Sequence, residues 1–175
     1  MSWYTSLAAW IEKRGGSRLI FRQQPDGSLD LYLKRYYILK TPWIEIMIHQ
    51  FFLSDEETVH DHPWDSASII LGGGYREHVL VKGKPASYFR RPGYIGGRSR
   101  FAFHRVELMP GMAGKVWTVF ITLARRRQWG FLTAEGWRPA PVVFKERGIE
   151  QAQTEHADYV GWLFPVRRGA PQRTR

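Results

Sequence analysis

Cysteine is absent from this chain of 175 residues. Its absence excludes disulfide bonds, thiolate zinc sites, iron–sulfur clusters and cysteine nucleophiles. The sequence also lacks an apolar run long enough to span a membrane, and no charged-then-apolar leader opens it. We therefore expect a protein with no membrane partner, and the missing cysteine is compatible with a cytoplasmic location.

Acidic residues are scarce, with 16 Asp and Glu against 26 Lys and Arg, which gives a formal net charge of +10. A strongly basic chain favours polyanionic partners such as nucleic acid or nucleotides. Part of this charge lies in a Pro/Gly-containing tail, 165–175, and no sequence-reading motif accompanies it. We expect at most weak, non-specific nucleic-acid binding, mostly through this tail.

Hydrophobic residues make up 43% of the chain and aromatic residues 15%. The first value excludes overall disorder, and the second favours β-strands, where rings pack on pleated surfaces. Short strand-like segments alternate with Gly/Pro turns, a pattern typical of a sandwich or small barrel. The expected strands are 18–24, 29–39, 45–53, 66–71, 75–81, 88–90, 101–108, 116–123 and 129–133.

An amphipathic helix is expected at the N-terminus, ending at Gly15 and Gly16. Its apolar residues recur at helical spacing, and they are Trp3, Leu7, Trp10 and Ile11. The length of the chain suits one domain. We divide it into the helix (1–16), a single domain (17–164) and the basic tail (165–175).

The segment from His60 to Asp65 reads His-Asp-His-Pro-Trp-Asp and concentrates metal-ligand types. Positions 60 and 62 share a face if they lie on one strand, because side chains alternate with period two. A third histidine, His104, lies in another expected strand. Three imidazoles and the Asp65 carboxylate would suit one divalent transition metal ion. A His-x-His pair alone would favour ordinary polar residues at a loop–strand junction, but the carboxylate, the later Gly72 and the later histidine favour a metal.

These residues resemble the first motif of the cupin family. That motif is a His-x-His pair, then Glu, then Gly seven residues later. Here His60 and His62 are followed by Asp65 and, seven residues on, by Gly72. The carboxylate is Asp in place of Glu, and it stands one residue nearer to the second histidine.

The second cupin motif is matched more loosely. Pro92-Gly93 lies well upstream of His104, and Leu108 stands where the family has Asn. Three short segments of the chain also resemble those of small cupins of phage and bacterial genomes: His-Asp-His-Pro-Trp-Asp, Gly-Gly-Gly-Tyr and Arg-Arg-Arg-Gln-Trp-Gly-Phe. The resemblance extends the expected location to the cytoplasm of a bacterium or a phage-infected host.

The resemblance implies an all-β, cupin-type double-stranded β-helix, or jelly roll, with a short N-terminal helix. The metal would lie inside the barrel on His60, His62 and His104, with Asp65 as a fourth ligand or as an acceptor behind the ligands. Such a site suits Fe(II), our first choice, and also Mn(II), Ni(II), Zn(II) or Co(II). Neutral imidazoles leave the positive charge of the ion uncompensated, which favours an anionic substrate.

Four further residues are candidates for substrate binding. Arg125 and Arg127 follow an expected strand, where a guanidinium would clamp a carboxylate or phosphate at the barrel mouth; a solvated strand end is the alternative. Trp64 flanks the histidine motif, and His49 lies in the expected strand 45–53. Both could line the pocket, although core packing is the favoured interpretation of each.

We therefore expect a metal-dependent cupin acting on a small anionic molecule, with a mononuclear Fe(II) dioxygenase ahead of an isomerase. One alternative is a non-catalytic module that binds a metal or a small molecule. Another is a metal-free protein similar to sugar-nucleotide epimerases, with histidine and carboxylate as acid and base. A nucleic-acid-associated accessory protein is the third. Because cupins often pair through outer strands and this chain is rich in aromatics, we also expect a homodimer.

Overall fold

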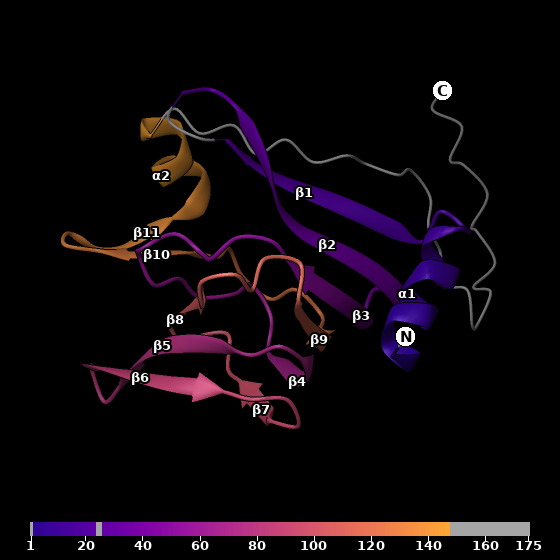
Figure 1. Ribbon diagram of the computed structural model, residues 1–175. Helices are drawn as coiled ribbons and strands as arrows, with labels where there is room; N and C mark the ends of the chain where they lie inside the picture. Colours follow the sequence, from indigo (N-terminus) through magenta and orange to yellow (C-terminus); the bar gives the residue numbers. More distant parts are fainter. Residues whose placement is uncertain (1, 24–25, 148–175) are drawn as a thin grey trace, which may run out of the picture.

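The computed structural model describes residues 2–23 and 26–147 as an all-β domain with two short helices (Figure 1). The expected tail at 165–175, and the end of the expected domain at 164, lie outside these residues. In chain order the elements are α1 (Trp3–Glu12), β1 (Ser17–Gln23), β2 (Leu29–Lys40), β3 (Ile44–Phe51), β4 (Ser66–Gly72), β5 (Tyr75–Val81), β6 (Lys84–Arg90), β7 (Ile95–Arg98), β8 (His104–Leu108), β9 (Val116–Leu123), β10 (Gly130–Thr133), β11 (Gly136–Pro139) and α2 (Ala140–Glu146).

The strands form two antiparallel sheets. The large sheet has the order β1-β2-β3-β9-β4-β7, and the small sheet has the order β6-β5-β8. His60 extends the small sheet, because it bridges His104 of β8 on one side and Phe131 of β10 on the other. The segment around His60 therefore lies next to β8 in the place of a fourth strand. The hairpin β10–β11 lies on the other side of this segment.

The connections between the sheets identify the fold. From β3 the chain crosses to the His60 segment, back to β4 and over to β5. After the β5–β6 hairpin it crosses again through β7, β8 and β9. Crossings in this order, between sheets β3-β9-β4-β7 and His60-β8-β5-β6, make a jelly roll. The expected all-β jelly roll with a short N-terminal helix is confirmed.

Helix α1 covers the outer face of the large sheet. Ala8 and Ile11 of the helix pack with Tyr36 of β2 and Ile48 of β3 in one buried cluster. A Cβ atom at Gly72 would lie 2.4 Å from the Tyr4 hydroxyl oxygen, so a larger residue there would displace the Tyr4 ring. Because side chains alternate along a strand, the neighbours of Tyr36 and Ile48 point to the opposite, inner face.

The inner face therefore carries a different set of side chains. Arg35 of β2 pairs in register with His49 of β3, and His49 pairs with Thr118 of β9. An apolar cluster fills the space beside this row. Its buried members are Ile20, Leu33, Phe51, Ile70, Tyr75, Val106 and Val116.

Some local expectations were wrong. His60 is an isolated bridge residue and residues 61–65 form no strand, so His60 and His62 do not share one continuous strand. Three elements were not expected: β7, β11 and α2. Among the described residues, no helix has the length and apolar character needed to cross a membrane.

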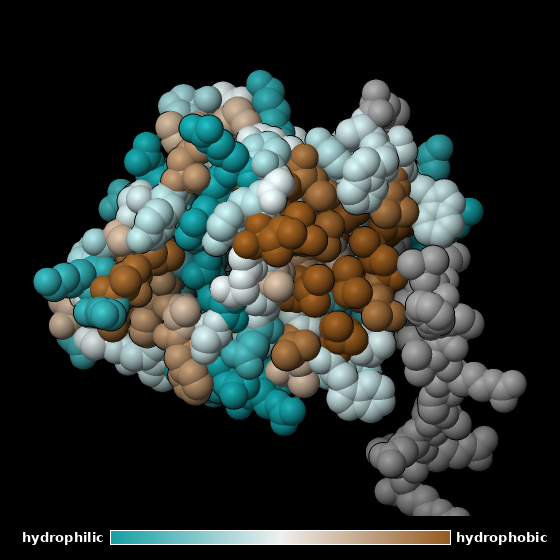
Figure 2. All heavy atoms as spheres, turned by 90° about the horizontal axis from the view of Figure 1, so that it is seen from below, coloured by the Kyte–Doolittle hydropathy of each residue, from teal (hydrophilic) through white to brown (hydrophobic). Residues whose placement is uncertain are grey.

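Apolar side chains also gather on the surface. Figure 2 shows such residues grouped on the face seen from below, with polar residues around them. Patches of this kind often mark interaction surfaces. The exposed large hydrophobic residues include Trp43, Phe89, Ile95, Phe101 and Leu123. The homodimer stays a prediction.

Candidate metal centre

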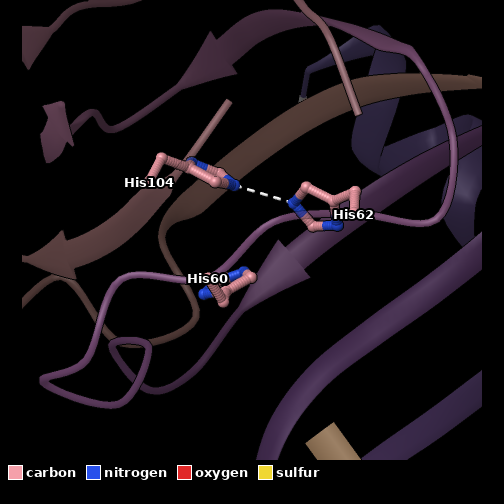
Figure 3. Close-up of side chains that lie close together, drawn as sticks. All are labelled: His60, His62 and His104. Atoms are coloured by element: carbon pink, nitrogen blue, oxygen red, sulfur yellow. Dashed lines mark hydrogen bonds between the residues drawn. The ribbon is translucent and has the colours of Figure 1, made fainter. Parts of the chain in front are cut away.

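Three histidine side chains converge between the two sheets. His60, His62 and His104 each offer a ring nitrogen, and these nitrogens all lie within 4.8 Å of one another. The Nε2 atoms of His62 and His104 are 2.7 Å apart (Figure 3). The ring centroid of His60 lies 5.1 Å from that of His62 and 5.0 Å from that of His104. The structure therefore brings together the three histidines that the sequence singles out.

Backbone pairing brings His60 and His104 together. The amide of His60 donates to the carbonyl of His104 at 2.8 Å, and the amide of His104 donates back at 2.9 Å. Residues paired in this way across an antiparallel bridge project their side chains to the same face. The two imidazoles therefore lie side by side although 44 positions separate them in the sequence.

Asp61 fixes the chain between His60 and His62. Its carboxylate is fully buried and accepts hydrogen bonds from the Gly130 amide at 2.7 Å, from Arg127 Nη1 at 2.6 Å and from Trp137 Nε1 at 2.9 Å. The bonds anchor the loop to the hairpin β10–β11. They hold the irregular segment that presents His62.

A buried carboxylate that the sequence analysis missed lies behind His104. Glu77 of β5 is 1% exposed, and its Oε1 atom is 3.3 Å from His104 Nδ1. Its other contacts are with arginines: Arg90 Nε donates to Oε2 at 2.8 Å, and Arg98 Nη2 donates to Oε1. A carboxylate bonded to Nδ1–H orients the ring and leaves Nε2 free to bind a ligand, as is common behind metal-binding histidines.

The sequence did contain a signal for Glu77. It shares strand parity with Tyr75 and Val79, which places it on the apolar side of β5. The stretch Arg76-Glu77-His78 reads as surface because two of its three residues point outward. Alternation, applied residue by residue, separates Glu77 from its neighbours.

Burial favours the neutral form of the three imidazoles. It lowers the pKa of His60 below its ordinary value, and it holds those of His62 and His104 well below. The positive charge of Arg98 and the neighbouring imidazoles lower the pKa of His62 and His104 further. A neutral imidazole keeps a lone pair for a metal. Three such rings fit a divalent transition ion, and the donor types suit Fe(II), Mn(II), Ni(II), Zn(II) and Co(II) alike.

Asp65 lies apart from this cluster. Its Oδ1 atom accepts a hydrogen bond from the Arg100 amide at 2.8 Å, and its Oδ2 atom is 3.2 Å from Arg100 Nη1. The side chain is 39% exposed. The ring nitrogens that approach one another belong to His60, His62 and His104, so Asp65 is not brought together with them.

A cavity opens beside the three histidines, with a volume of about 90 Å³. His49 and Trp64, which the sequence suggested as substrate-binding residues, both line it. The remaining lining residues include Tyr32, Phe51, Tyr75, Phe120 and two arginines, Arg35 and Arg98.

The two arginines expected at the mouth lie elsewhere. Arg127 Nη1 donates to Asp61 and, at 3.1 Å, to the Arg100 carbonyl, so its guanidinium has a structural role. Arg125 is exposed. Neither lines the cavity, whose arginines come instead from β2 and β7.

No model of a known protein family matches the sequence, and no curated protein is similar to it. Among solved structures, hydroxypropylphosphonic acid epoxidase from S. wedmorenis is similar, with 12% identity and a TM-score of 0.44 over 53% of this chain. A structure of Fe(II) HppE has 13% identity and a TM-score of 0.46, over 61% of this chain and 56% of that one. KdgF from Halomonas sp. has 17% identity and a TM-score of 0.40, over 53% of this chain and 80% of that one.

This chain covers only about half of the length of the epoxidase, 51%. These proteins are similar to this chain in backbone structure, at low sequence identity. The fold assignment rests on the strand order described above, and the site on its own geometry.

Proposed function

We propose that this protein is a metal-dependent cupin that acts on a small anionic molecule. His60, His62 and His104 would hold one divalent transition metal ion. The observation that carries the proposal is the convergence of three imidazoles, one of them oriented by the buried carboxylate of Glu77. Orientation of this kind would serve no purpose for a merely polar patch on the surface.

A bound divalent ion supplies Lewis acidity, and Fe(II) in addition supplies reactivity toward O₂, which makes a dioxygenase our first choice of enzyme class. The chain's own contribution is orientation and charge. Glu77 holds His104 in one tautomer, and its charge is already matched by Arg90 and Arg98. Since no anionic ligand is added by the three imidazoles, the site stays cationic and favours an anion.

The contact between His104 and Glu77 also supports a second candidate function. His104 and Glu77 resemble an acid–base couple, with Nδ1 and Oε1 3.3 Å apart. In a metal-free protein His104 would take up or release a proton at Nε2 while Glu77 holds the ring in place. This is the chemistry of the epimerase-like alternative.

Metal analysis tests the proposal directly. We expect protein purified without a histidine tag to retain, or to take up after incubation with metal salts, about one transition metal ion per chain. His62→Ala should lose this binding. A matched control is His78→Ala, since His78 lies on β5 with its Nε2 bonded to Glu107 at 2.6 Å, away from the cluster. Elemental analysis that finds no metal before or after incubation, or equal metal in His62→Ala, would refute the proposal.

Asp65 provides a second comparison. Its carboxylate is bonded to Arg100 and lies apart from the cluster. We therefore expect Asp65→Ala to retain metal nearly as well as the wild type. A loss as large as that of His62→Ala would make Asp65 a ligand after all.

Activity separates the reaction classes. The apoprotein is loaded with Fe(II), Mn(II), Ni(II), Zn(II) and Co(II) in turn, and small carboxylates are screened for product and O₂ uptake. O₂ uptake with Fe(II) alone indicates a dioxygenase, and turnover without O₂ uptake indicates an isomerase or lyase. Turnover in the metal-free protein favours acid–base chemistry. Ligand binding without turnover favours the non-catalytic module.

A further inference from the structure

Part of the cavity lining next to the histidine cluster carries polar atoms without protein partners. Arg35 Nε, His49 Nε2 and Trp64 Nε1 are buried, and none has a hydrogen-bond partner within residues 2–23 and 26–147. All three side chains line the same cavity. His49 is 4% exposed, so bulk water does not satisfy it. Buried polar groups are nearly always hydrogen-bonded, which makes three such atoms in one cavity a feature to explain.

We propose that Arg35, His49 and Trp64 form an oxyanion subsite that holds a carboxylate-type group of the substrate while the rest of the molecule faces the histidine cluster. This rests on the proposed function, which it deepens by naming the substrate class and the residues that select it. The guanidinium supplies charge, the indole supplies one N–H donor, and the imidazole supplies another in its Nε2–H tautomer.

The strand register places these groups together. Arg35 and His49 are directly paired on β2 and β3, on the inner face of the large sheet. The His49 ring stacks on Phe120, with centroids 4.9 Å apart. Trp64 stacks on His62 at 6.2 Å with an interplanar angle of 17°. The subsite therefore borders the candidate metal centre directly.

The charges around the cavity favour an anion over water as the occupant, because three guanidinium groups stand against two carboxylates. Glu77 binds both Arg90 and Arg98, so it balances only one of their two charges. Asp55 accepts hydrogen bonds from neutral donors, the Tyr32 hydroxyl and, at 2.6 Å, the Val106 amide, and its charge therefore balances one more. Arg35 forms no ion pair within the part of the chain that the structure describes. Burial lowers the pKa of His49 most, and the charge of Arg35 lowers it next, so this charge acts on the neighbouring cavity residue.

A second arginine strengthens this excess of positive charge. Arg18 of β1 pairs in register with Arg35, and its Nε atom is also buried without a partner among the described residues. Like charges directly opposite one another destabilise a sheet unless something compensates them. An anion beside Arg35 compensates both, whereas a water molecule compensates neither.

The test uses metal-free protein, so that it does not depend on the metal. Malonate, acetate and inorganic phosphate are titrated into the wild type and variants by calorimetry, at low and at moderate salt. We expect at least one anion to bind the wild type, and Arg35→Met to weaken it about tenfold or more, because a charge-assisted hydrogen bond is lost. Arg35→Lys should restore part of the affinity. Arg105→Met is the matched control, since Arg105 also has a buried, unpartnered Nε atom within the described residues but does not line this cavity.

A second measurement locates the anion. The indole N–H resonance of Trp64, assigned by its disappearance in Trp64→Phe, should shift on titration in the wild type and not in Arg35→Met. Equal affinity in the wild type and Arg35→Met would overturn the subsite, as would binding that leaves the Trp64 signal unmoved or no binding of any of the three anions. A protein that binds anions in this way but retains no metal would uphold the subsite and refute the metal proposal.

Discussion

The two walls of the cavity are built on opposite principles. On the small-sheet side the charged groups are matched within the protein, since Glu77 binds Arg90, Arg98 and His104. On the large-sheet side Arg35 and His49 each present a buried atom that no described residue satisfies. Both walls are polar and buried, so burial alone does not explain the difference.

The difference indicates what each wall does. A matched network fixes side chains in one arrangement, which is what ligand histidines need. An unmatched wall gains its partners only when a molecule enters, so it serves recognition. Stability should therefore depend strongly on the small-sheet wall and weakly on the large-sheet wall, while ligand affinity should show the reverse.

The largest expected effect is on the small-sheet wall. Glu77→Gln removes the charge that compensates Arg90 and Arg98, and breaking a buried ion pair on one side costs about 3–5 kcal/mol. We expect a loss of this size in the free energy of unfolding, measured by urea denaturation. Glu107→Gln is the control, because Glu107 is 38% exposed and its ion pairs should contribute less than about 1 kcal/mol. Similar losses in the two variants would contradict the comparison.

An intermediate effect is expected in the pH dependence of the free energy of unfolding. The contribution of His49 to it can be measured separately by substitution. Burial, and after it the charge of Arg35, hold the pKa of His49 well below its ordinary value of 6.5. Above pH 6.5 His49 is neutral in both states and contributes no slope. Below it the unfolded chain takes up a proton that the folded protein does not, so stability falls as the pH falls toward the folded pKa.

Each such histidine should therefore lower the free energy of unfolding by about 1.4 kcal/mol per pH unit below 6.5. His60, His62 and His104 have lowered pKa values for the same first reason, burial, and add to the slope. We expect His49→Gln to reduce the loss between pH 7.5 and pH 5.5 by about 1.4 kcal/mol relative to the wild type. Unfolding curves that shift in parallel for both proteins would show that His49 titrates normally.

The sequence predicted one wall better than the other. His60, His62 and His104 were found because ligand types recur at a spacing that a known family uses. The fold followed from the same resemblance and from short strands between Gly/Pro turns. Glu77 was missed because its neighbours Arg76 and His78 are polar, although its strand parity with Tyr75 and Val79 agrees with its burial.

The large-sheet wall could not be derived from the sequence, because it depends on strand register. Arg35 lies among other basic and aromatic residues of β2, and nothing in the sequence says that it is opposite His49. The sequence favours Arg125 and Arg127 as substrate-binding residues because they belong to a run of three arginines after an expected strand. Arg127 is instead bound by Asp61, from which it is separated by 66 positions in the sequence. Charge clusters in a sequence do not indicate where each charge is satisfied.

The smallest expected effect on stability is on the large-sheet wall itself. Arg35→Met keeps the length of the side chain and breaks no ion pair within the described residues, so no protein group is left unpaired. We expect the free energy of unfolding of the ligand-free protein to change by less than about 1 kcal/mol, or to rise slightly, because a buried unsatisfied donor is removed. The wild type and Arg35→Met should differ more clearly in stability when the anion that binds best is added. At 100 times its dissociation constant it should stabilise the wild type by about 2.7 kcal/mol. Arg35→Met, with an affinity about tenfold lower, should gain only about half as much at the same concentration. If Arg35→Met without ligand lost as much unfolding free energy as Glu77→Gln, Arg35 would support the fold. Both walls would then stabilise the protein, and the proposed division between stability and recognition would be wrong.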